Sequence, residues 1–145
     1  MAGFGAAAAA PQRCPCGGGP YRQCCGPLHR GEQQASTVEQ LMRSRYSAYA
    51  LDQFDYLLAT HPSEQDPAER RRELAAAART VRWQGLTITA CSGGGPEDLE
   101  GTVSFEARYR AGGRSGVMRE CSRFGRAGNS LSGGWLYLEA LELSG

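Results

Sequence analysis

The chain has 145 residues, and its 16 basic side chains, all arginine, nearly balance 15 acidic ones, so the formal net charge is +1. This length fits one domain with a small additional module. The near-neutral charge argues against general binding of nucleic acids or of anionic membranes. No apolar stretch approaches the roughly 20 residues that a membrane-spanning helix needs. The composition therefore predicts a soluble globular protein and excludes the collagen, coiled-coil and transmembrane classes.

We expect residues 1–12 to form a disordered, alanine-rich tail. The basic region that opens a secretory signal peptide is missing there. A short organellar targeting segment is the alternative, because the first acidic residue is Glu32. We expect a cytoplasmic protein.

Four of the six cysteines, Cys14, Cys16, Cys24 and Cys25, lie within twelve residues. A secreted scaffold would spread its disulfides along the chain, whereas a local cluster favours a metal site in a reducing compartment. Four thiolates suit zinc, and they would close its tetrahedral shell as in a structural site. His29 could replace one cysteine, and four free or oxidised thiols in a disordered segment are the alternative. Residues 13–31 have no helical or strand period, so a bound ion would supply their order.

Three helices are predicted after this segment. A capping box of Ser36 and Glu39 starts the first, whose apolar face carries Val38, Leu41, Met42, Arg45, Tyr46 and Tyr49. The second should run over 53–60 behind a cap at Asp52, and the third from Pro67 to about Thr80 behind a cap at Asp66.

The period then changes to two, which predicts strands over 82–91, 101–110, 115–124 and 135–143. The short turns between them favour an antiparallel meander. The predicted fold class is α+β, with three helices packed in a curved four-stranded antiparallel sheet.

Two charged residues fall on apolar faces, Arg45 on the first helix and Glu120 on the third strand. We expect them to form a buried ion pair, which would be either structural or the polar base of a ligand pocket. Tyr46 and His61 are the other pocket candidates, although a tyrosine there is more often core and a loop histidine more often caps or lies at the surface. Cys91 and Cys121 are expected to be small buried residues.

The early motif, Cys14-Pro15-Cys16-Gly17 followed by Tyr21 and Cys24-Cys25-Gly26, resembles the SEC-C motif, the zinc-binding element at the C-terminus of the SecA translocase. The downstream chain is similar to the YchJ-like family in an ordered series of motifs: Glu39-Gln-Leu-Met-Arg-Ser-Arg-Tyr-Ser-Ala-Tyr-Ala50, Asp55-Tyr56-Leu57, Thr60-His61-Pro62-Ser63, Trp83-Gln84-Gly85-Leu86 and Glu120-Cys-Ser-Arg-Phe124. The family usually has eight residues between the second and third cysteines, and this chain has seven. The resemblance implies a zinc-binding module over 13–31 and a cone-shaped domain of the nuclear transport factor 2-like fold over 36–143.

The leading hypothesis is a non-enzymatic zinc-binding protein that uses the SEC-C-like module as an interaction surface or adaptor. By analogy with the SecA tail, its partner would be a protein or ribosome-associated. The alternative is a small-molecule binder or enzyme that uses the cone interior through Arg45, Tyr46, His61 and Glu120. A thiol redox protein is a third reading. The sequence indicates no catalytic residue, because phosphate loops, nucleophile elbows and zinc-protease motifs are missing from it.

Overall fold

The computed structural model describes residues 12–144, so the predicted tail lies outside the described residues except for Gln12. Two short helices, η1 (Tyr21–Gln23) and α1 (Gly26–His29), occupy the cysteine-rich segment. The longer helices are α2 (Val38–Ala50), α3 (Phe54–Ala59) and α4 (Pro67–Ala78). The strands are β1 (Val81–Gly93), β2 (Glu100–Ala111), β3 (Arg114–Arg126) and β4 (Trp135–Ser144), with the short helix η2 (Ala127–Asn129) before the last.

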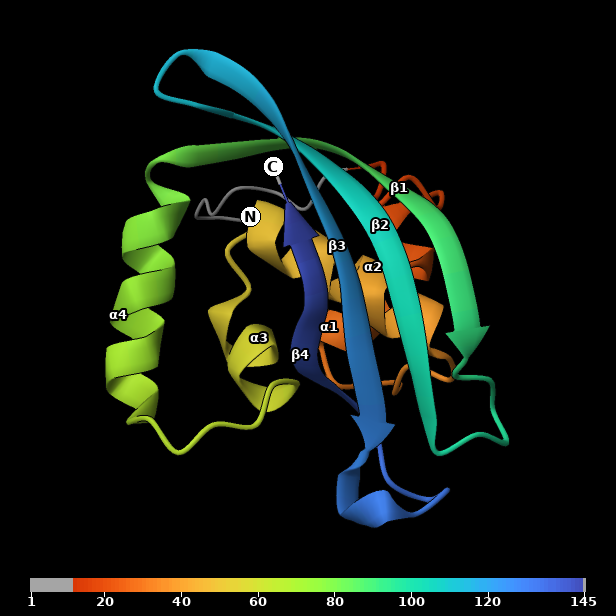
Figure 1. Ribbon diagram of the computed structural model, residues 1–145. Coiled ribbons are helices and arrows are strands. Elements are labelled where there is room, and N and C mark those ends of the chain that lie inside the picture. The colour runs from red at the N-terminus through yellow and green to blue at the C-terminus, as the bar shows by residue number, and fades with distance from the viewer. Residues whose placement is uncertain (1–11, 145) are drawn as a thin grey trace.

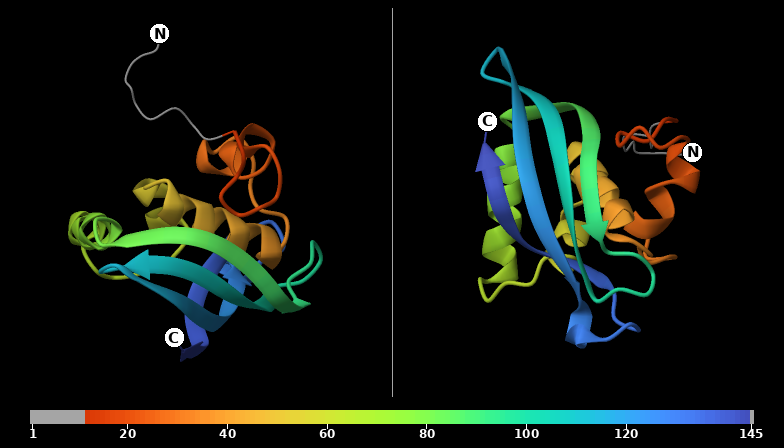
Figure 2. Two further views of the ribbon diagram at one scale, coloured as in Figure 1. Left: turned by 90° about the horizontal axis from the view of Figure 1, so that it is seen from above. Right: turned by 45° about the vertical axis from the view of Figure 1, so that its right-hand side comes forward.

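The four strands form one antiparallel sheet in the order β1-β2-β3-β4, which confirms the predicted meander and the α+β class. The sheet curves around α2, and the cysteine-rich segment lies on the opposite side of that helix (Figure 1, Figure 2). The molecule therefore has three layers, with α2 in the middle. α4 stands at one side and buries no residue, so it covers little of the core.

The start of α2 differs by one residue from the prediction. Thr37, not Ser36, is the N-cap, and its hydroxyl accepts a hydrogen bond from the Gln40 backbone N–H at 3.1 Å. The Gln40 side chain accepts in turn from the Ser36 N–H at 2.7 Å. Thr37 and Gln40 therefore have the spacing predicted for Ser36 and Glu39, but the Gln40 side chain reaches the N–H of Ser36, one residue before the cap, and not that of Thr37.

The predicted cap of α3 is also wrong. Asp52 has a φ of 58°, and Gln53 stands at the N-cap without a side-chain hydrogen bond. The cap of α4 is confirmed, because Asp66 accepts from the Glu69 N–H at 3.0 Å. A carboxylate there also stabilises the positive end of the helix.

One hydrophobic core joins all three layers. The sheet contributes Val103, Phe105, Ala107 and Phe124 from its concave face, and α2 contributes Val38, Leu41, Met42 and Tyr46. Cys14, Cys16, Tyr21, Cys25 and Leu28 of the cysteine-rich segment belong to the same cluster. The segment is thus packed against the domain, although the predicted boundaries 13–31 and 36–143 stay predictions.

Neither of the two isolated cysteines is buried as expected. Cys91 is exposed on β1, and Cys121 on β3 is only partly buried. Cys121 pairs with Ser104 on the outer face of the sheet, whereas Cys91 pairs with Val103 on the concave face, near the open end of β1, where its thiol contacts Glu39 of α2. Among the described residues, no helix is long and apolar enough to cross a membrane.

Candidate metal centre and the cone cavity

A tight backbone reversal places the first two cysteines. The Cys14 N–H donates to the Gly19 carbonyl at 2.7 Å, and the Gly17 N–H donates to the Cys14 carbonyl at 3.0 Å. Gly17 and Gly19 have φ values of 87° and 117°, a region that other residues rarely adopt. Cys24 and Cys25 follow η1 and precede α1, so the two short helices hold the second pair of thiols opposite the first.

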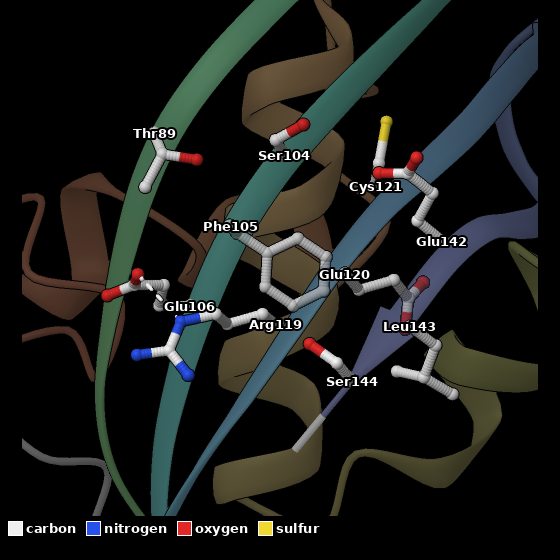
Figure 3. A pocket seen from close by; sticks show the side chains of 10 residues that line it. All are labelled: Thr89, Ser104, Phe105, Glu106, Arg119, Glu120, Cys121, Glu142, Leu143 and Ser144. Atoms are coloured by element: carbon white, nitrogen blue, oxygen red, sulfur yellow. Dashed lines mark hydrogen bonds and ion pairs between the residues drawn. The ribbon is translucent and has the colours of Figure 1, made fainter.

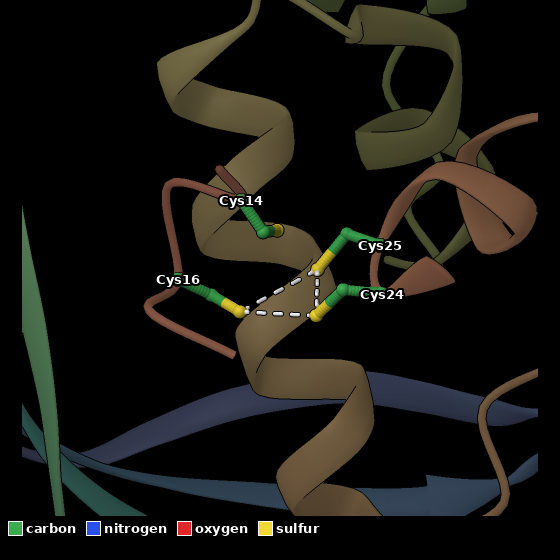
Figure 4. A group of neighbouring side chains, drawn as sticks. All are labelled: Cys14, Cys16, Cys24 and Cys25. Carbon is green, nitrogen blue, oxygen red and sulfur yellow. Dashed lines mark hydrogen bonds between the residues drawn. The ribbon is translucent and has the colours of Figure 1, made fainter. Parts of the chain in front are cut away.

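All four sulfur atoms lie within 4.8 Å of one another (Figure 4). The Sγ–Sγ distances are 3.5 Å for Cys16 to Cys24, 3.9 Å for Cys24 to Cys25 and 3.8 Å for Cys25 to Cys16. Zinc–sulfur bonds of about 2.3 Å in a tetrahedron give sulfur–sulfur edges of about 3.8 Å. Cys16, Cys24 and Cys25 therefore have the sulfur spacing that a single zinc ion requires, and the Cys14 Sγ lies within 4.8 Å of each of them.

Gly18 has no side chain where the sulfurs come closest to the backbone. A Cβ at this position would lie 2.8 Å from the Cys24 Sγ and 3.2 Å from the Cys16 Sγ. The loop can pack over the sulfurs only because residue 18 is glycine.

The charge state of the thiols favours a cation. Hydrogen bonds from the Cys16 and Cys25 thiols lower the pKa of Cys14, and the hydrogen bond with Cys14 raises the pKa of Cys25. Burial raises the pKa of Cys24 to about 12. Cys24 and Cys25 thus hold their protons in the absence of a cation, and a bound divalent cation would have to displace them.

Burial of the cluster fits a closed, structural shell. Cys14, Cys16 and Cys25 are 4%, 1% and 1% exposed, and Cys24 is partly buried. Four sulfur ligands would leave no coordination position for water or substrate. The donor set of Cys14, Cys16, Cys24 and Cys25 therefore fits a metal ion in a closed shell, and four thiolates suit zinc.

His29 is held away from the sulfur cluster by two other hydrogen bonds. Its Nε2 donates to the Ser44 carbonyl at 2.8 Å, which leaves Nδ1 to accept from the Tyr21 hydroxyl at 2.6 Å. Burial lowers the pKa of His29, which favours this neutral form. With both ring nitrogens engaged, His29 does not take the place of a cysteine.

α2 supports the cluster through small and basic side chains. The Ser47 hydroxyl lies 3.3 Å from the Cys14 Sγ, and the Arg43 Nη1 donates to the Cys16 carbonyl at 2.9 Å. The Ser44 hydroxyl lies 2.7 Å from that of Tyr56 on α3 and donates to the Leu41 carbonyl. The contacts of Ser47 and Arg43 attach the cysteine-rich segment to the face of α2 that points away from the sheet, and the Ser44 hydroxyl joins α2 to α3.

The opposite face of α2 borders a cavity of about 380 Å³. The four predicted pocket residues, Arg45, Tyr46, His61 and Glu120, all line it, together with Met42, Tyr49, Trp83, Phe105, Ala107, Met118 and Tyr137. Sequence reasoning missed Tyr137, because its place beside Glu120 depends on the pairing of β3 with β4.

The expected ion pair between Arg45 and Glu120 is wrong. Arg45 donates from Nη1 to the Leu57 carbonyl at 3.1 Å and to the Thr60 hydroxyl at 2.6 Å. Glu120 accepts from the hydroxyls of Ser122 and Tyr137. The Tyr137 ring connects the two charges, since the Arg45 Cζ lies 4.9 Å from its centroid.

A second hollow of about 410 Å³ lies where the outer side chains of the strands meet the end of β4 (Figure 3). Arg119 and Glu106 are charged residues of this hollow, and they form an ion pair with 3.1 Å between the Arg119 Nε and the Glu106 Oε2. The pair is partly exposed, and we assign this hollow no role.

Comparison with known proteins identifies the chain. Residues 37–140 match the family model described as the YchJ middle NTF2-like domain. The chain belongs to the YchJ-like family. YchJ-like relatives include a UPF0225 protein of Ralstonia nicotianae, 47% identical over 131 residues that cover 87% of this chain and 88% of the relative. A UPF0225 protein of Chromobacterium violaceum is 46% identical over 130 residues, covering 88% and 91%. These relatives are bacterial, which argues against organellar import.

Two solved structures share the YchJ-like arrangement, and both are described as SEC-C motif containing proteins. The solution structure from Rhodopseudomonas palustris has a TM-score of 0.74 and 36% identity, and it covers 91% of this chain and 99% of that one. The crystal structure from Psychrobacter arcticus has a TM-score of 0.71 and 26% identity, covering 92% and 84%. The fold and the SEC-C resemblance are thereby confirmed for the YchJ-like chain.

Proposed function

We propose that the protein binds one structural zinc ion through Cys14, Cys16, Cys24 and Cys25, and that the ordered segment serves as a non-enzymatic interaction module. The convergence of four sulfurs within 4.8 Å of one another, three of them at zinc-like spacing, is the observation that carries the proposal. A closed four-sulfur shell leaves zinc no open position for catalysis. The thiols would be available for zinc in a reducing cytoplasm.

The exposed part of the module supports a role in contacts with a partner. Arg13 and Arg22 point to solvent, and no ion pair within the described residues includes either of them. Arg30 differs, because it forms an ion pair with Glu32, with 2.8 Å between the Arg30 Nε and the Glu32 Oε2. A partner that fits this surface would present acidic groups, as an acidic protein segment or a ribosome-associated surface does.

Native mass spectrometry of protein purified without added metal tests the zinc part of the proposal. We expect one zinc per chain, because structural zinc binds with about 10 kcal/mol or more. Cys16→Ser should lose most of the zinc, whereas Cys91→Ser, a change at an exposed cysteine outside the cluster, should retain it. Zinc retained equally by both variants would refute the assignment.

The interaction part needs a separate experiment. Zinc-loaded protein and its Arg13→Glu/Arg22→Glu variant should be cross-linked in cells and their partners compared. We expect the double variant to lose a partner that Arg72→Glu, a change on exposed α4, keeps. The same set of partners for all three proteins would refute the use of this surface.

A further inference from the structure

The cavity between α2 and the sheet has the dimensions and lining of a small-molecule site. Its volume of about 380 Å³ lies at the lower end of the range for ligand pockets, about 300–1,000 Å³. Trp83, Phe105, Ala107 and Met118 form an aromatic and apolar wall, and Arg45, His61 and Glu120 supply polar groups. A smaller hollow of about 200 Å³ under α4 shares Arg45, Tyr49 and His61 with it.

Arg45 is a buried cation without an anionic partner. Arg45 is only 4% exposed, and its two hydrogen bonds go to a neutral carbonyl and a neutral hydroxyl, with the Tyr49 hydroxyl as a further polar neighbour. None of the ion pairs among residues 12–144 includes it. A buried charge is costly unless an opposite charge or a set of hydrogen bonds compensates it.

The unused donors of Arg45 border open space. Both of its hydrogen bonds leave from Nη1. Within the described part of the chain, no fully buried side-chain nitrogen or oxygen lacks a hydrogen-bond partner, so the remaining donors, Nε and Nη2, keep some accessible surface, and Arg45 lines both hollows. These two groups form one edge of the guanidinium, whose parallel N–H bonds match the two oxygens of a carboxylate.

The other polar groups of the cavity do not supply the missing anion. Glu120 is stabilised by the hydroxyls of Ser122 and Tyr137, the latter at 2.9 Å. His61 packs its ring edge-on against Tyr137, with 4.9 Å between centroids, and burial lowers its pKa, as do Arg45 and Arg70. A neutral His61 beside the guanidinium can donate a further hydrogen bond to an anion.

We propose that this cavity binds a small organic carboxylate with an aromatic or apolar body. The carboxylate pairs with the Nε–Nη2 edge of Arg45, and the body packs against Trp83 and Met118. The site is separate from the zinc cluster, because α2 presents Arg45 on one face and Ser47 on the other. The proposal therefore stands independently of the proposed interaction role.

An NMR titration of the full zinc-loaded chain tests this, with phenylacetate and indole-3-acetate as probes and phenylacetamide as the uncharged isostere. The chain has only two histidines, so the ring signals of His61 report on the cavity and those of His29 serve as an internal control. We expect phenylacetate to shift the His61 signals, to leave the His29 signals in place and to bind at least about tenfold more tightly than the amide, a difference of about 1.4 kcal/mol. Equal binding of acid and amide, or no His61 shift with either acid up to about 10 mM, would overturn the proposal.

Two variants separate recognition from folding. Arg45→Met should abolish the preference for the acid, but Arg45 also holds the end of α3 through Leu57, so this variant could misfold. Ala107→Leu fills the cavity from the sheet side without removing the guanidinium, and it should weaken phenylacetate binding about tenfold or more. Ala77→Leu, on the exposed side of α4, should bind as the wild type does. Unchanged phenylacetate binding by Ala107→Leu would contradict the location.

Discussion

At the scale of single residues, the cysteine cluster depends on neighbours that carry no ligand atom. Gly18 leaves room for two sulfurs, and Ser47 and Arg43 contact the cluster from α2. The cysteines themselves could be found from their spacing in the sequence. Ser47 and Arg43 could not, because they lie 33 and 27 residues from their contacts and only the docking of α2 brings them there.

Gly18→Ala should weaken zinc binding by roughly tenfold or more, the range for changes next to metal ligands. The added methyl group would overlap the Sγ of Cys24 and of Cys16, so at least one sulfur would have to move. Competition with a chromophoric chelator measures the affinity. Gly95→Ala is the control, because its Cβ would meet only Asp98 at an ordinary 3.4 Å. Equal affinities of the two variants would contradict the role of Gly18.

Zinc affinity should rise with pH. The pKa of Cys24 is raised to about 12 by burial and that of Cys25 is raised by its hydrogen bond with Cys14, so without a cation both are protonated at neutral pH. Zinc must displace these protons, and each proton released makes the affinity about tenfold higher per pH unit. Isothermal titration calorimetry in buffers of different ionisation enthalpy counts the protons. Release of no proton at pH 7 would show that the thiols are already ionised.

At the scale of elements, α2 makes different contacts on two opposite faces. Ser44 and Ser47 meet the cysteine-rich segment and α3, while Arg45 and Tyr46 face the cavity and the sheet. The helical period in the sequence predicted the sheet-facing side, since apolar residues recur there. On the side with small polar residues, apolar residues do not recur with the helical period, so the contacts of that side could not be predicted. The helices η1 and α1 are too short to show a helical period.

The N-cap of α2 illustrates a limit of motif reasoning at this scale. Ser36 with Glu39 and Thr37 with Gln40 both satisfy the capping-box pattern, and only backbone geometry chooses between them. The predicted ion pair between Arg45 and Glu120 is wrong because it, too, depends on three-dimensional packing that the sequence pattern does not show. Both residues do line one cavity, but Tyr137 from β4 takes the position between them.

Thr37→Ala should lower the free energy of unfolding by about 1 kcal/mol, because the Gln40 N–H loses its acceptor. Ser36→Ala should cost less than about 0.5 kcal/mol, since its backbone N–H keeps the bond to the Gln40 side chain. Urea denaturation of the zinc-loaded proteins measures both. A larger loss for Ser36→Ala would place the cap one residue earlier.

At the scale of the whole molecule, the cysteine-rich segment and the sheet share a core through α2. Cys16, Tyr21 and Leu28 belong to the same buried cluster as Phe105 and Phe124. Zinc bound to the folded state would therefore stabilise the entire chain and not only its first layer.

Removal of zinc should lower the free energy of unfolding by about 3 kcal/mol or more, the linkage expected when zinc exceeds its Kd a hundredfold. Hydrogen exchange should show loss of protection first in residues 14–31 and in the face of α2 around Ser44 and Ser47, with β2 and β3 protected longest. Uniform loss of protection at all positions would indicate that the layers unfold as one unit. Unchanged stability after chelation would argue against a structural ion.

X-ray absorption at the zinc edge tests the central claim most directly, since it reports the ligands of the ion in the intact protein. We predict a first shell of four sulfurs at about 2.3 Å, with no nitrogen or oxygen ligand. A shell with fewer than four sulfurs, completed by nitrogen or oxygen atoms, would contradict the assignment of Cys14, Cys16, Cys24 and Cys25 as a closed structural site.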